Sequence, residues 1–299
     1  MKIKYSFIIP HKNSEIYLNR CVNSIPNRSD VEIIIVDDNS SVNQKPHFDQ
    51  DNIKIIYLNS MESKGAGHAR NVGLSEIKGE WVLFPDCDDY YEDGFLEKLN
   101  SFDSSDIDVV YFNSLFRDGE TGEILPHNPL YYDFENYDGS IASIDAVKFH
   151  HNAPWTKMVS KKYIRRYGFC FEETRNGNDL FFSMCIGYCT NRIEIIKQPL
   201  YSYMKNKNSI TNKVLSPKEA LCLINHTIQA NKFYKFLNRE EWCLPIIMPL
   251  LRFFKTCGLS FFLLFVLKIP YVIRHSNDLI KLVTSLNKEE SAKQSLMVV

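Results

Sequence analysis

The sequence predicts an α/β protein with a mostly parallel sheet, followed by a helical C-terminal region. In the N-terminal third of the chain, short β-branched runs alternate with amphipathic segments, which is the pattern of βαβ units. The run from Ile33 to Val36 is wholly apolar, as expected for a strand that is covered on both faces. Polar side chains follow the first strands at the points where the chain leaves the sheet.

Hydrophobic periodicity places the individual elements along the chain. The predicted strands of the first half are 3–9, 31–36, 53–58, 81–84 and 109–112, and the helices between them are 14–25, 67–77 and 93–99. The next segment, 117–138, is rich in Gly, Pro, Asn and Tyr, which indicates an irregular excursion or a hairpin. The elements predicted after it are a helix at 179–188, a strand at 193–198 and a long helix at 217–237.

The composition limits the classes of partner. The net charge is −1 and 24% of the 299 residues are charged, so the chain lacks the basic surface that is typical of nucleic-acid-binding proteins. The eight cysteines show no CxxC spacing, which argues against a zinc site and against a disulfide framework. The first apolar stretch is too short for a signal peptide, and we therefore expect a cytoplasmic protein.

Residues 244–273 are rich in Leu, Ile and Phe, with basic residues among and beside them. The longest apolar run in this segment is shorter than the ~20 residues that a membrane-spanning helix needs. Basic residues near an aromatic-rich apolar run suit a helix that lies on an anionic membrane surface, which would make the protein peripheral on the inner face of the membrane. A buried helix of the core explains the same residues.

Three carboxylates within four positions follow the predicted strand 81–84. Asp86, Asp88 and Asp89 would repel one another unless a cation neutralised them. Hard divalent cations take oxygen ligands and are often shared with substrate phosphates. The segment therefore predicts a metal–nucleotide site, whereas a polar turn in which an Asp caps the next helix is the alternative.

Other polar segments are expected to face the same crevice. Residues 10–15 follow the first strand and 37–40 follow the second, and open α/β sheets bind ligands beyond the carboxyl ends of their strands. Residues 64–74 add a glycine-bearing loop that enters a helix. This loop is not a dinucleotide fingerprint, because it follows the third strand and Arg70 stands where the third glycine would be. Basic residues beside backbone amides at a helix start instead suit a nucleotide, and a solvated helix start is the alternative.

Together these segments resemble the successive signatures of family-2 inverting glycosyltransferases with the GT-A fold. The matching segments are 6–10 with Asn13 and Glu15, 36–40, 69–74, 86–89, 152–157, 176–182 and 201–211. Their order and spacing match up to about residue 212, which the resemblance makes the end of a catalytic domain. The implied organisation is a nucleotide-binding half of about 1–115, an acceptor half of about 116–212 and a helical C-terminal region of 213–299.

The resemblance implies roles for individual residues on the nucleotide side of the site. The residues that would border the nucleotide are Pro10, Glu15, Asp38 and Arg70. Of these, Asp38 and Arg70 would lie near the base, and Asp86 would lie near the ribose.

It also implies the metal, the base and the acceptor platform. Asp88, the last residue of a DXD motif, would hold Mn²⁺ or Mg²⁺ on the diphosphate, and Asp179 would be the general base. Trp155 would offer its face to an acceptor sugar, although a core position explains this Trp as well. Two positions depart from the family pattern. Lys12 stands where an aromatic residue is common, and Asn178 replaces the Glu that usually precedes the catalytic Asp.

The predicted function is that of an inverting, metal-dependent glycosyltransferase, either a hexosyl- or an N-acetylhexosaminyltransferase. The expected donor is a UDP-sugar, and the expected acceptor is a glycan or lipid-linked glycan of surface polysaccharide biosynthesis. A sugar hydroxyl is a poor nucleophile at neutral pH, so a carboxylate must accept its proton as it attacks the anomeric carbon. Two alternatives remain. One is a nucleotide- or glycan-binding module without turnover, and the other is a nucleotidyltransferase, which also needs clustered Asp residues and Mg²⁺.

Overall fold

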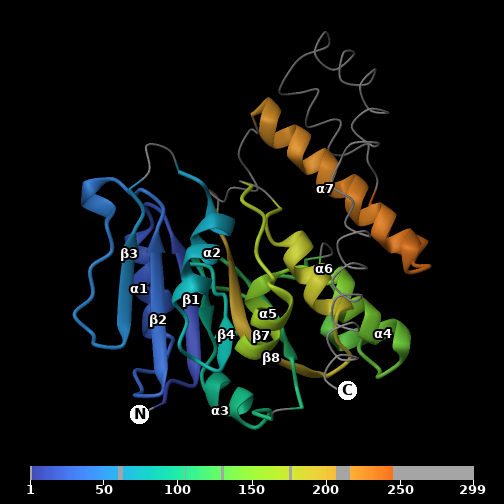
Figure 1. Ribbon diagram of the computed structural model, residues 1–299, viewed down its shortest axis with the longest axis horizontal. Coiled ribbons are helices and arrows are strands. Elements are labelled where there is room, and N and C mark those ends of the chain that lie inside the picture. Colours follow the sequence, from blue (N-terminus) through green and yellow to red (C-terminus); the bar gives the residue numbers. More distant parts are fainter. Residues whose placement is uncertain are drawn as a thin grey trace, which may run out of the picture.

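The computed structural model describes residues 2–59, 63–104, 106–128, 131–174, 177–206 and 216–244. Within them an eight-stranded sheet has the order β3-β2-β1-β4-β7-β6-β8-β5 (Figure 1). The strands are β1 Tyr5–His11, β2 Val31–Asp37, β3 Ile53–Tyr57, β4 Trp81–Leu83, β5 Tyr90–Tyr91, β6 Val109–Asp118, β7 Lys157–Ser160 and β8 Ile193–Lys205. The α-helices are α1 Glu15–Asn23, α2 Ala66–Glu76, α3 Phe95–Asn100, α4 Ile141–Asp145, α5 Lys161–Tyr167, α6 Leu180–Tyr188 and α7 Pro217–Phe236.

The sheet is mostly parallel, as the sequence predicts. Strand β1 pairs in parallel with β2 and β4, β2 with β3, and β6 with β8. Two strands run the other way: β7 is inserted between β4 and β6, and β5 pairs with the end of β8. The sequence analysis missed β7 because it has only four residues and begins with a lysine, which gives no alternating pattern.

Apolar side chains cover both faces of the sheet. Neighbouring residues of β1 point to opposite sides, so that Ile8 belongs to one buried cluster and Phe7 and Ile9 belong to the other. This alternation explains why the central strands are apolar at nearly every position. The carboxyl ends of β1, β2 and β4 are therefore held at one edge of a well-packed sheet.

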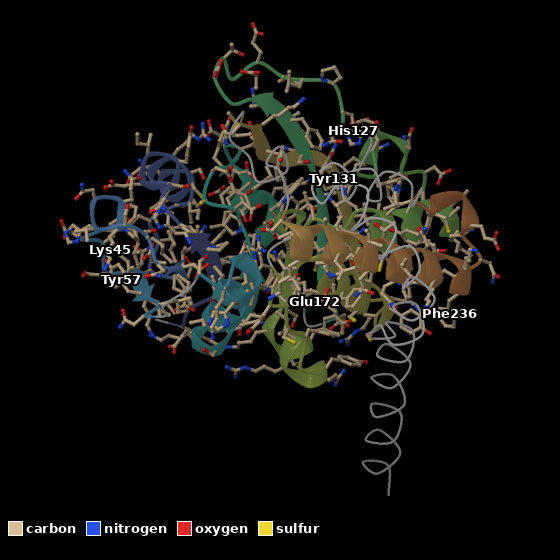
Figure 2. All side chains as sticks on the ribbon, turned by 90° about the horizontal axis from the view of Figure 1, so that it is seen from above. Lys45, Tyr57, His127, Tyr131, Glu172 and Phe236 are labelled. Atoms are coloured by element: carbon tan, nitrogen blue, oxygen red, sulfur yellow. The ribbon has the colours of Figure 1, made fainter. Side chains whose placement is uncertain are left out.

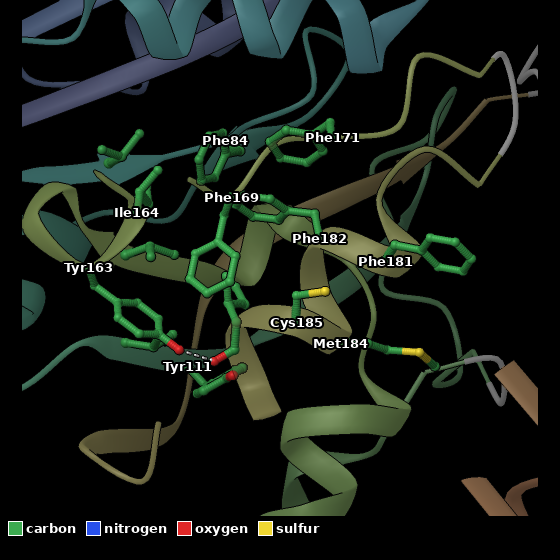
Figure 3. Close-up of a cluster of buried hydrophobic side chains, with 14 of the residues drawn as sticks. Phe84, Tyr111, Tyr163, Ile164, Phe169, Phe171, Phe181, Phe182, Met184 and Cys185 are labelled. Carbon is green, nitrogen blue, oxygen red and sulfur yellow. Dashed lines mark hydrogen bonds between the residues drawn. The ribbon is translucent and has the colours of Figure 1, made fainter. Parts of the chain in front are cut away.

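An aromatic cluster packs the segment after α5 against the sheet (Figure 3). The rings of Phe171 and Phe182 stack with centroids 3.9 Å apart, and Phe84 meets both rings edge-on at 5.2 and 5.3 Å. Phe84 directly follows β4, whereas Phe182 lies in α6. This packing brings the start of α6 close to the carboxyl end of β4.

Helix α7 packs into the same hydrophobic core as the residues that precede it. Its start is defined by a capping box between Ser216 and Glu219, and it confirms the long helix predicted at 217–237. Phe233 and Tyr234 are fully buried members of the larger apolar cluster, and the Tyr234 hydroxyl donates to the carbonyl of Phe149 at 3.2 Å. In the described part of the chain, no helix is both long and apolar enough to cross a bilayer. The predicted boundary at 212 and nearly all of 244–273 lie outside the described residues.

Candidate functional site

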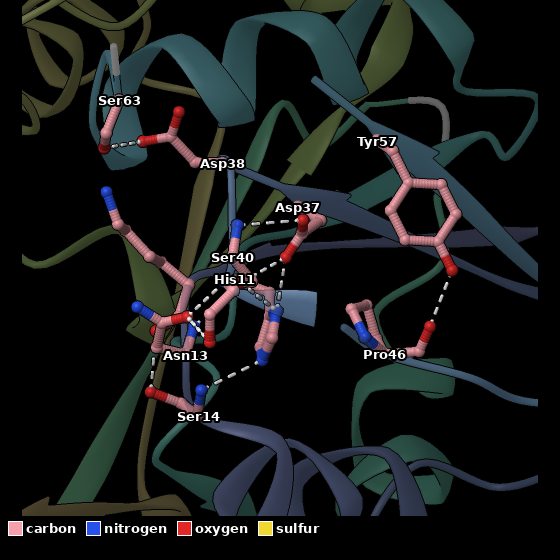
Figure 4. Close-up of polar contacts among 11 residues, drawn as sticks. His11, Asn13, Ser14, Asp37, Asp38, Ser40, Pro46, Tyr57 and Ser63 are labelled. Atoms are coloured by element: carbon pink, nitrogen blue, oxygen red, sulfur yellow. Dashed lines mark hydrogen bonds and ion pairs between the residues drawn. The ribbon is translucent and has the colours of Figure 1, made fainter. Parts of the chain in front are cut away.

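A buried polar network joins the loops that follow β1 and β2 (Figure 4). The Asp37 carboxylate accepts hydrogen bonds from the Ser40 hydroxyl and from Nδ1 of His11, the latter at 2.9 Å. Nε2 of His11 accepts from the backbone N–H of Ser14 at 3.2 Å. His11, Asp37 and Ser40 are all buried, so this network fixes the shape of the two loops.

Asp38 is buried and ties the end of β2 to the loop that opens α2. Its carboxylate accepts from the Ser63 hydroxyl and from the backbone N–H groups of Lys64 at 3.1 Å and Gly65 at 2.7 Å. The Ser63 contact is drawn in Figure 4. Asp38 thus fixes the loop before α2 to the end of β2.

Arg70 connects three segments that are far apart in the sequence. It lies in α2 with only 4% of its surface exposed. One guanidinium nitrogen donates to Oδ1 of Asn178 at 2.8 Å, and another forms an ion pair with the Asp86 carboxylate. The guanidinium also lies 5.2 Å above the ring of Phe171. Because Asn178 directly precedes Asp179, Arg70 holds the acidic loop after β4 beside the start of α6.

The loop after β4 carries Asp86 and Asp88, which are both partly exposed. The side chain of Asp86 is 31% exposed, and Asp88 is half-buried. The Asp88 carboxylate accepts from the side-chain amide of Asn206 at 3.1 Å, and its carbonyl accepts from Arg20. Burial raises the pKa of Asp88, and the neighbouring charge of Asp86 raises it further.

Asp89, by contrast, points into the protein. Its two carboxylate oxygens accept from the backbone N–H of Met204 at 2.8 Å and from the hydroxyl of Tyr201 at 3.0 Å. The Tyr201 hydroxyl in turn accepts from the backbone N–H of Asp86 at 3.0 Å. Burial raises the pKa of Asp89 well above its usual range, with Asp88 adding to the shift. Asp89 therefore holds the loop in place through its contacts inside the protein.

This support gives a stability prediction. Asp89→Leu should leave the Tyr201 hydroxyl and the Met204 N–H without acceptors, and we expect it to lower the free energy of unfolding by about 2–4 kcal/mol. Asp89→Asn keeps an acceptor oxygen and should cost less than about 1 kcal/mol at neutral pH. Urea denaturation of the two variants checks this. Equal losses would show that the carboxylate does not hold the loop through these two bonds.

Asp179 lies at the N-terminal end of α6 and is half-buried. Its side chain does not cap the helix, so the carboxylate is not used by the start of α6. Burial raises the pKa of Asp179, while the positive charge of Arg70 opposes this rise. The Asp179 carboxylate thus lies close enough to Arg70 and Asp86 for their charges to act on it.

The first residue of β7 is a buried lysine close to Asp179. Lys157 is fully buried and donates from Nζ to the carbonyls of His151, at 2.9 Å, and Ala153. Burial lowers the pKa of Lys157 to about 7, against the opposing charge of Asp179. Lys157 thus carries a titratable charge close to the carboxylate.

Trp155 is 3% exposed and lies between aromatic rings. It stacks on Tyr201 with centroids 5.1 Å apart and on Tyr203 at 5.6 Å, and it meets Tyr131 edge-on at 5.5 Å. This burial favours the core alternative for Trp155 over the acceptor platform.

The chain matches a known protein family. The family described as "Glycosyl transferase family 2" matches residues 6–168, more than half of the chain. The chain belongs to glycosyl transferase family 2. The segments that carry the predicted nucleotide crevice all lie within this match.

Family 2 relatives extend the similarity beyond the matched residues. The chain is 25% identical over 217 residues to the putative glycosyltransferase EpsH of Bacillus subtilis, covering 70% of this chain and 62% of EpsH. It is 31% identical over 223 residues to glycosyltransferase GlyG of Streptococcus pneumoniae, covering 69% of this chain and 72% of GlyG.

The structure of a further relative shows the fold. A crystal structure of S. aureus TarS 1–349 in complex with UDP-GlcNAc superposes with a TM-score of 0.59 at 22% identity, covering 85% of this chain and 71% of that one. This likeness confirms the predicted GT-A fold class. The chain spans less than two thirds of the length of EpsH and 38% of full-length TarS.

The acidic loop of this family 2 chain fits a divalent cation. Among the described residues, no group of three or more His, Cys, Asp or Glu side chains is arranged to hold a metal. Mg²⁺ needs fewer protein ligands where substrate phosphates complete its shell, and one or two carboxylates then suffice. Asp86 and Asp88 supply two carboxylates, and the charge of Asp86 adds to the rise that burial causes in the pKa of Asp88. A cation shared with a diphosphate would relieve the repulsion between the two carboxylates.

Four of the predicted site residues of this family 2 chain lie close together. Asp86, Asp88, Arg70 and Asp179 gather at one edge of the sheet, linked through Asn178. Pro10 is buried near the end of β1 and Glu15 opens α1, the helix whose Arg20 donates to the carbonyl of Asp88. The nucleotide, metal, base and acceptor roles of all these residues remain predictions.

The sequence marks 201–211 only as a segment that resembles the family, and it does not indicate which of these residues support the cluster. Tyr201 of β8 and Asn206, which directly follows β8, hold the acidic loop through Asp89 and Asp88. The available signal was the Tyr-rich end of the strand predicted at 193–198, which continues to Lys205. Its partners lie more than a hundred residues earlier, so no local pattern reveals them.

Proposed function

We propose that this chain is an inverting, metal-dependent glycosyltransferase that transfers a sugar from a UDP-sugar to a hydroxyl of a glycan or lipid-linked acceptor in surface polysaccharide biosynthesis. The observation that carries the proposal is Arg70, which joins the loop of Asp86 and Asp88 to the segment of Asp179. The site therefore combines two carboxylates that can bind a metal ion with a separate carboxylate that can act as a base.

Different groups of the site accept the proton and stabilise the leaving group. The Asp179 carboxylate accepts the proton of the acceptor hydroxyl as its oxygen attacks the anomeric carbon. A divalent cation held by Asp88 would stabilise the charge that develops on the departing nucleoside diphosphate. One base and one attack from the side opposite the leaving group give a single displacement, and hence inversion at the anomeric carbon. Arg70 contributes by favouring the ionised form of Asp179.

The donor class is supported by a relative. S. aureus TarS is named a poly(ribitol-phosphate) beta-N-acetylglucosaminyltransferase, and its structures hold UDP-GlcNAc or UDP. The shared family and fold favour a UDP-sugar donor and a polymeric surface acceptor for this chain as well.

Ligand-dependent stability tests the donor class. We expect UDP with Mn²⁺ to raise the thermal stability, because a ligand at a hundredfold its Kd stabilises the folded state by about 2.7 kcal/mol. GDP, CMP and NAD should give smaller shifts, and EDTA should remove the UDP shift. Thermal denaturation with each nucleotide, with Mn²⁺ and with EDTA, provides the measurement. A shift for GDP alone would contradict the UDP assignment, and a shift that survives EDTA would contradict metal dependence.

One observation favours a second candidate, a nucleotide- or glycan-binding module without turnover. Asn178 stands where the family usually has Glu, and it uses its side-chain oxygen to hold Arg70. Asp179 is nevertheless present and is not used by the helix, so we place transfer first. Binding of UDP with Mn²⁺ but no hydrolysis or transfer over a broad acceptor panel would reverse this order.

A further inference from the structure

Helix α7 contacts the segment that carries Asp179. His226 of α7 is 4% exposed, and its Nε2 lies 3.0 Å from Oε2 of Glu172. Glu172 belongs to the connection between α5 and α6, and Figure 2 shows it beside α7. An element that lies beyond the residues resembling the family thus reaches the loop before the predicted base.

His226 also touches the chain on both sides of Asp179. Gly177 has a φ of +67°, and a Cβ at this position would lie 2.4 Å from Nδ1 of His226. Phe181, in the first turn of α6, meets the His226 ring edge-on at 5.7 Å. The imidazole therefore packs directly against the backbone turn that leads into Asp179 and against the helix that follows it.

The opposite side of the same loop is held by α2. Asn71 exchanges two hydrogen bonds with the backbone of Phe171, at 2.8 and 2.9 Å, and His68 pairs with Glu173 at 2.8 Å. The N–H of Glu172 donates to the carbonyl of Asn178 at 3.1 Å and so closes the loop. The loop is thus fixed between α2 and α7, and His226 provides the ionic contact from α7.

The charge state of His226 suits this role. Burial alone would lower its pKa, but the contacts with Cys222 and Glu172 raise it to about 9. Among the described residues, Glu172 faces the ring from the loop, Cys222 faces it from α7 itself, and α6 contributes the uncharged Phe181. These contacts thus favour the charged form of His226, and the ring faces the Glu172 carboxylate.

We infer that His226 is a positioning residue for Asp179, acting through its ion pair with Glu172 and its packing on Gly177. Helix α7 is then part of the machinery that orients the base, although it lies outside the residues that resemble the family. This inference rests on the proposed transferase function, because it assigns Asp179 a reaction to perform. Small misplacements of a reacting group are costly, since about 1 Å can reduce a rate by 10²-fold.

The test uses the full chain with UDP-GlcNAc and Mn²⁺, and measures donor hydrolysis in His226→Gln, Glu172→Gln and the double variant. We expect kcat to fall by about 10- to 100-fold in each single variant, with KM for UDP-GlcNAc unchanged, because neither residue borders the acidic loop. The kcat of the double variant should not fall below that of the less active single variant, because the two substitutions break the same interaction. Lys235→Gln, an exposed change on the same helix, is the matched control and should keep the wild-type kcat.

Hydrogen exchange separates this inference from the proposed function. In His226→Gln, amides in 177–182 should exchange at least about tenfold faster than in the wild type, while those of β1 should not change. A wild-type kcat in His226→Gln would overturn the inference. So would a loss of protection spread over the whole chain, which indicates a merely structural role. If the wild type binds UDP but shows no turnover, the proposed function fails, and local exchange alone then decides whether His226 holds the loop.

Discussion

Replacing Asp179 with Asn is expected to lower kcat for sugar transfer at least about 10²-fold while UDP binding stays unchanged. The substitution keeps the size of the side chain but removes the group that accepts the proton of the acceptor hydroxyl. General-base catalysis contributes about 10²- to 10⁴-fold, and we expect a loss of kcat in this range. The carboxylate does not cap α6, so the fold should tolerate the change. Steady-state transfer kinetics and thermal stability with UDP and Mn²⁺ measure the two effects.

The pH dependence of the wild type provides a second check on Asp179. Only the ionised carboxylate accepts a proton, and burial raises the pKa of Asp179 above its usual value. Activity should therefore fall as the pH decreases through this raised pKa, and it should recover as the pH rises. Asp49→Asn, at a side chain that is 93% exposed, is the control and should leave the profile unaltered. Wild-type turnover in Asp179→Asn with intact UDP binding would show that another group is the base.

The fold was predictable where local pattern and topology agree. The apolar runs that became β1, β2 and β3 each end in polar residues, and parallel strands place such ends at one edge. The loop after β4 could be assigned to the same edge for the same reason. The general position of the acidic loop thus follows from the sequence.

What could not be predicted depends on contacts between distant segments. The ion pair of Arg70 with Asp86 and its bond to Asn178 join α2, the loop after β4 and the start of α6. The sequence marks Asn178 only as a departure from the family pattern, whereas the structure shows which side chain it holds. The surroundings of Trp155 could not be predicted either, because an aromatic residue in a polar segment gives no sign that three tyrosine rings will enclose it.

Asp88→Ala is expected to remove the metal-dependent part of UDP binding with little effect on the fold. The Asp88 carboxylate is half-buried, and its side-chain hydrogen bond is with Asn206. Burial raises the pKa of Asp88 and the charge of Asp86 raises it further, so removing the carboxylate relieves both effects and offsets the lost bond. The stabilisation of about 2.7 kcal/mol expected for UDP with Mn²⁺ at a hundredfold Kd should therefore vanish, while the stability without ligand stays within about 1 kcal/mol of the wild type.

The comparison that isolates this effect is Asp93→Ala, which removes an exposed carboxylate five positions along the same chain segment. Both variants lose one negative charge near the acidic loop, so a general electrostatic effect on UDP would change them alike. Only Asp88→Ala should become insensitive to EDTA, because only Asp88 is placed beside Asp86 to share a cation. If Asp88→Ala keeps an EDTA-sensitive UDP shift, the cation is held elsewhere, and the carboxylate of Asp86 becomes the residue to replace next.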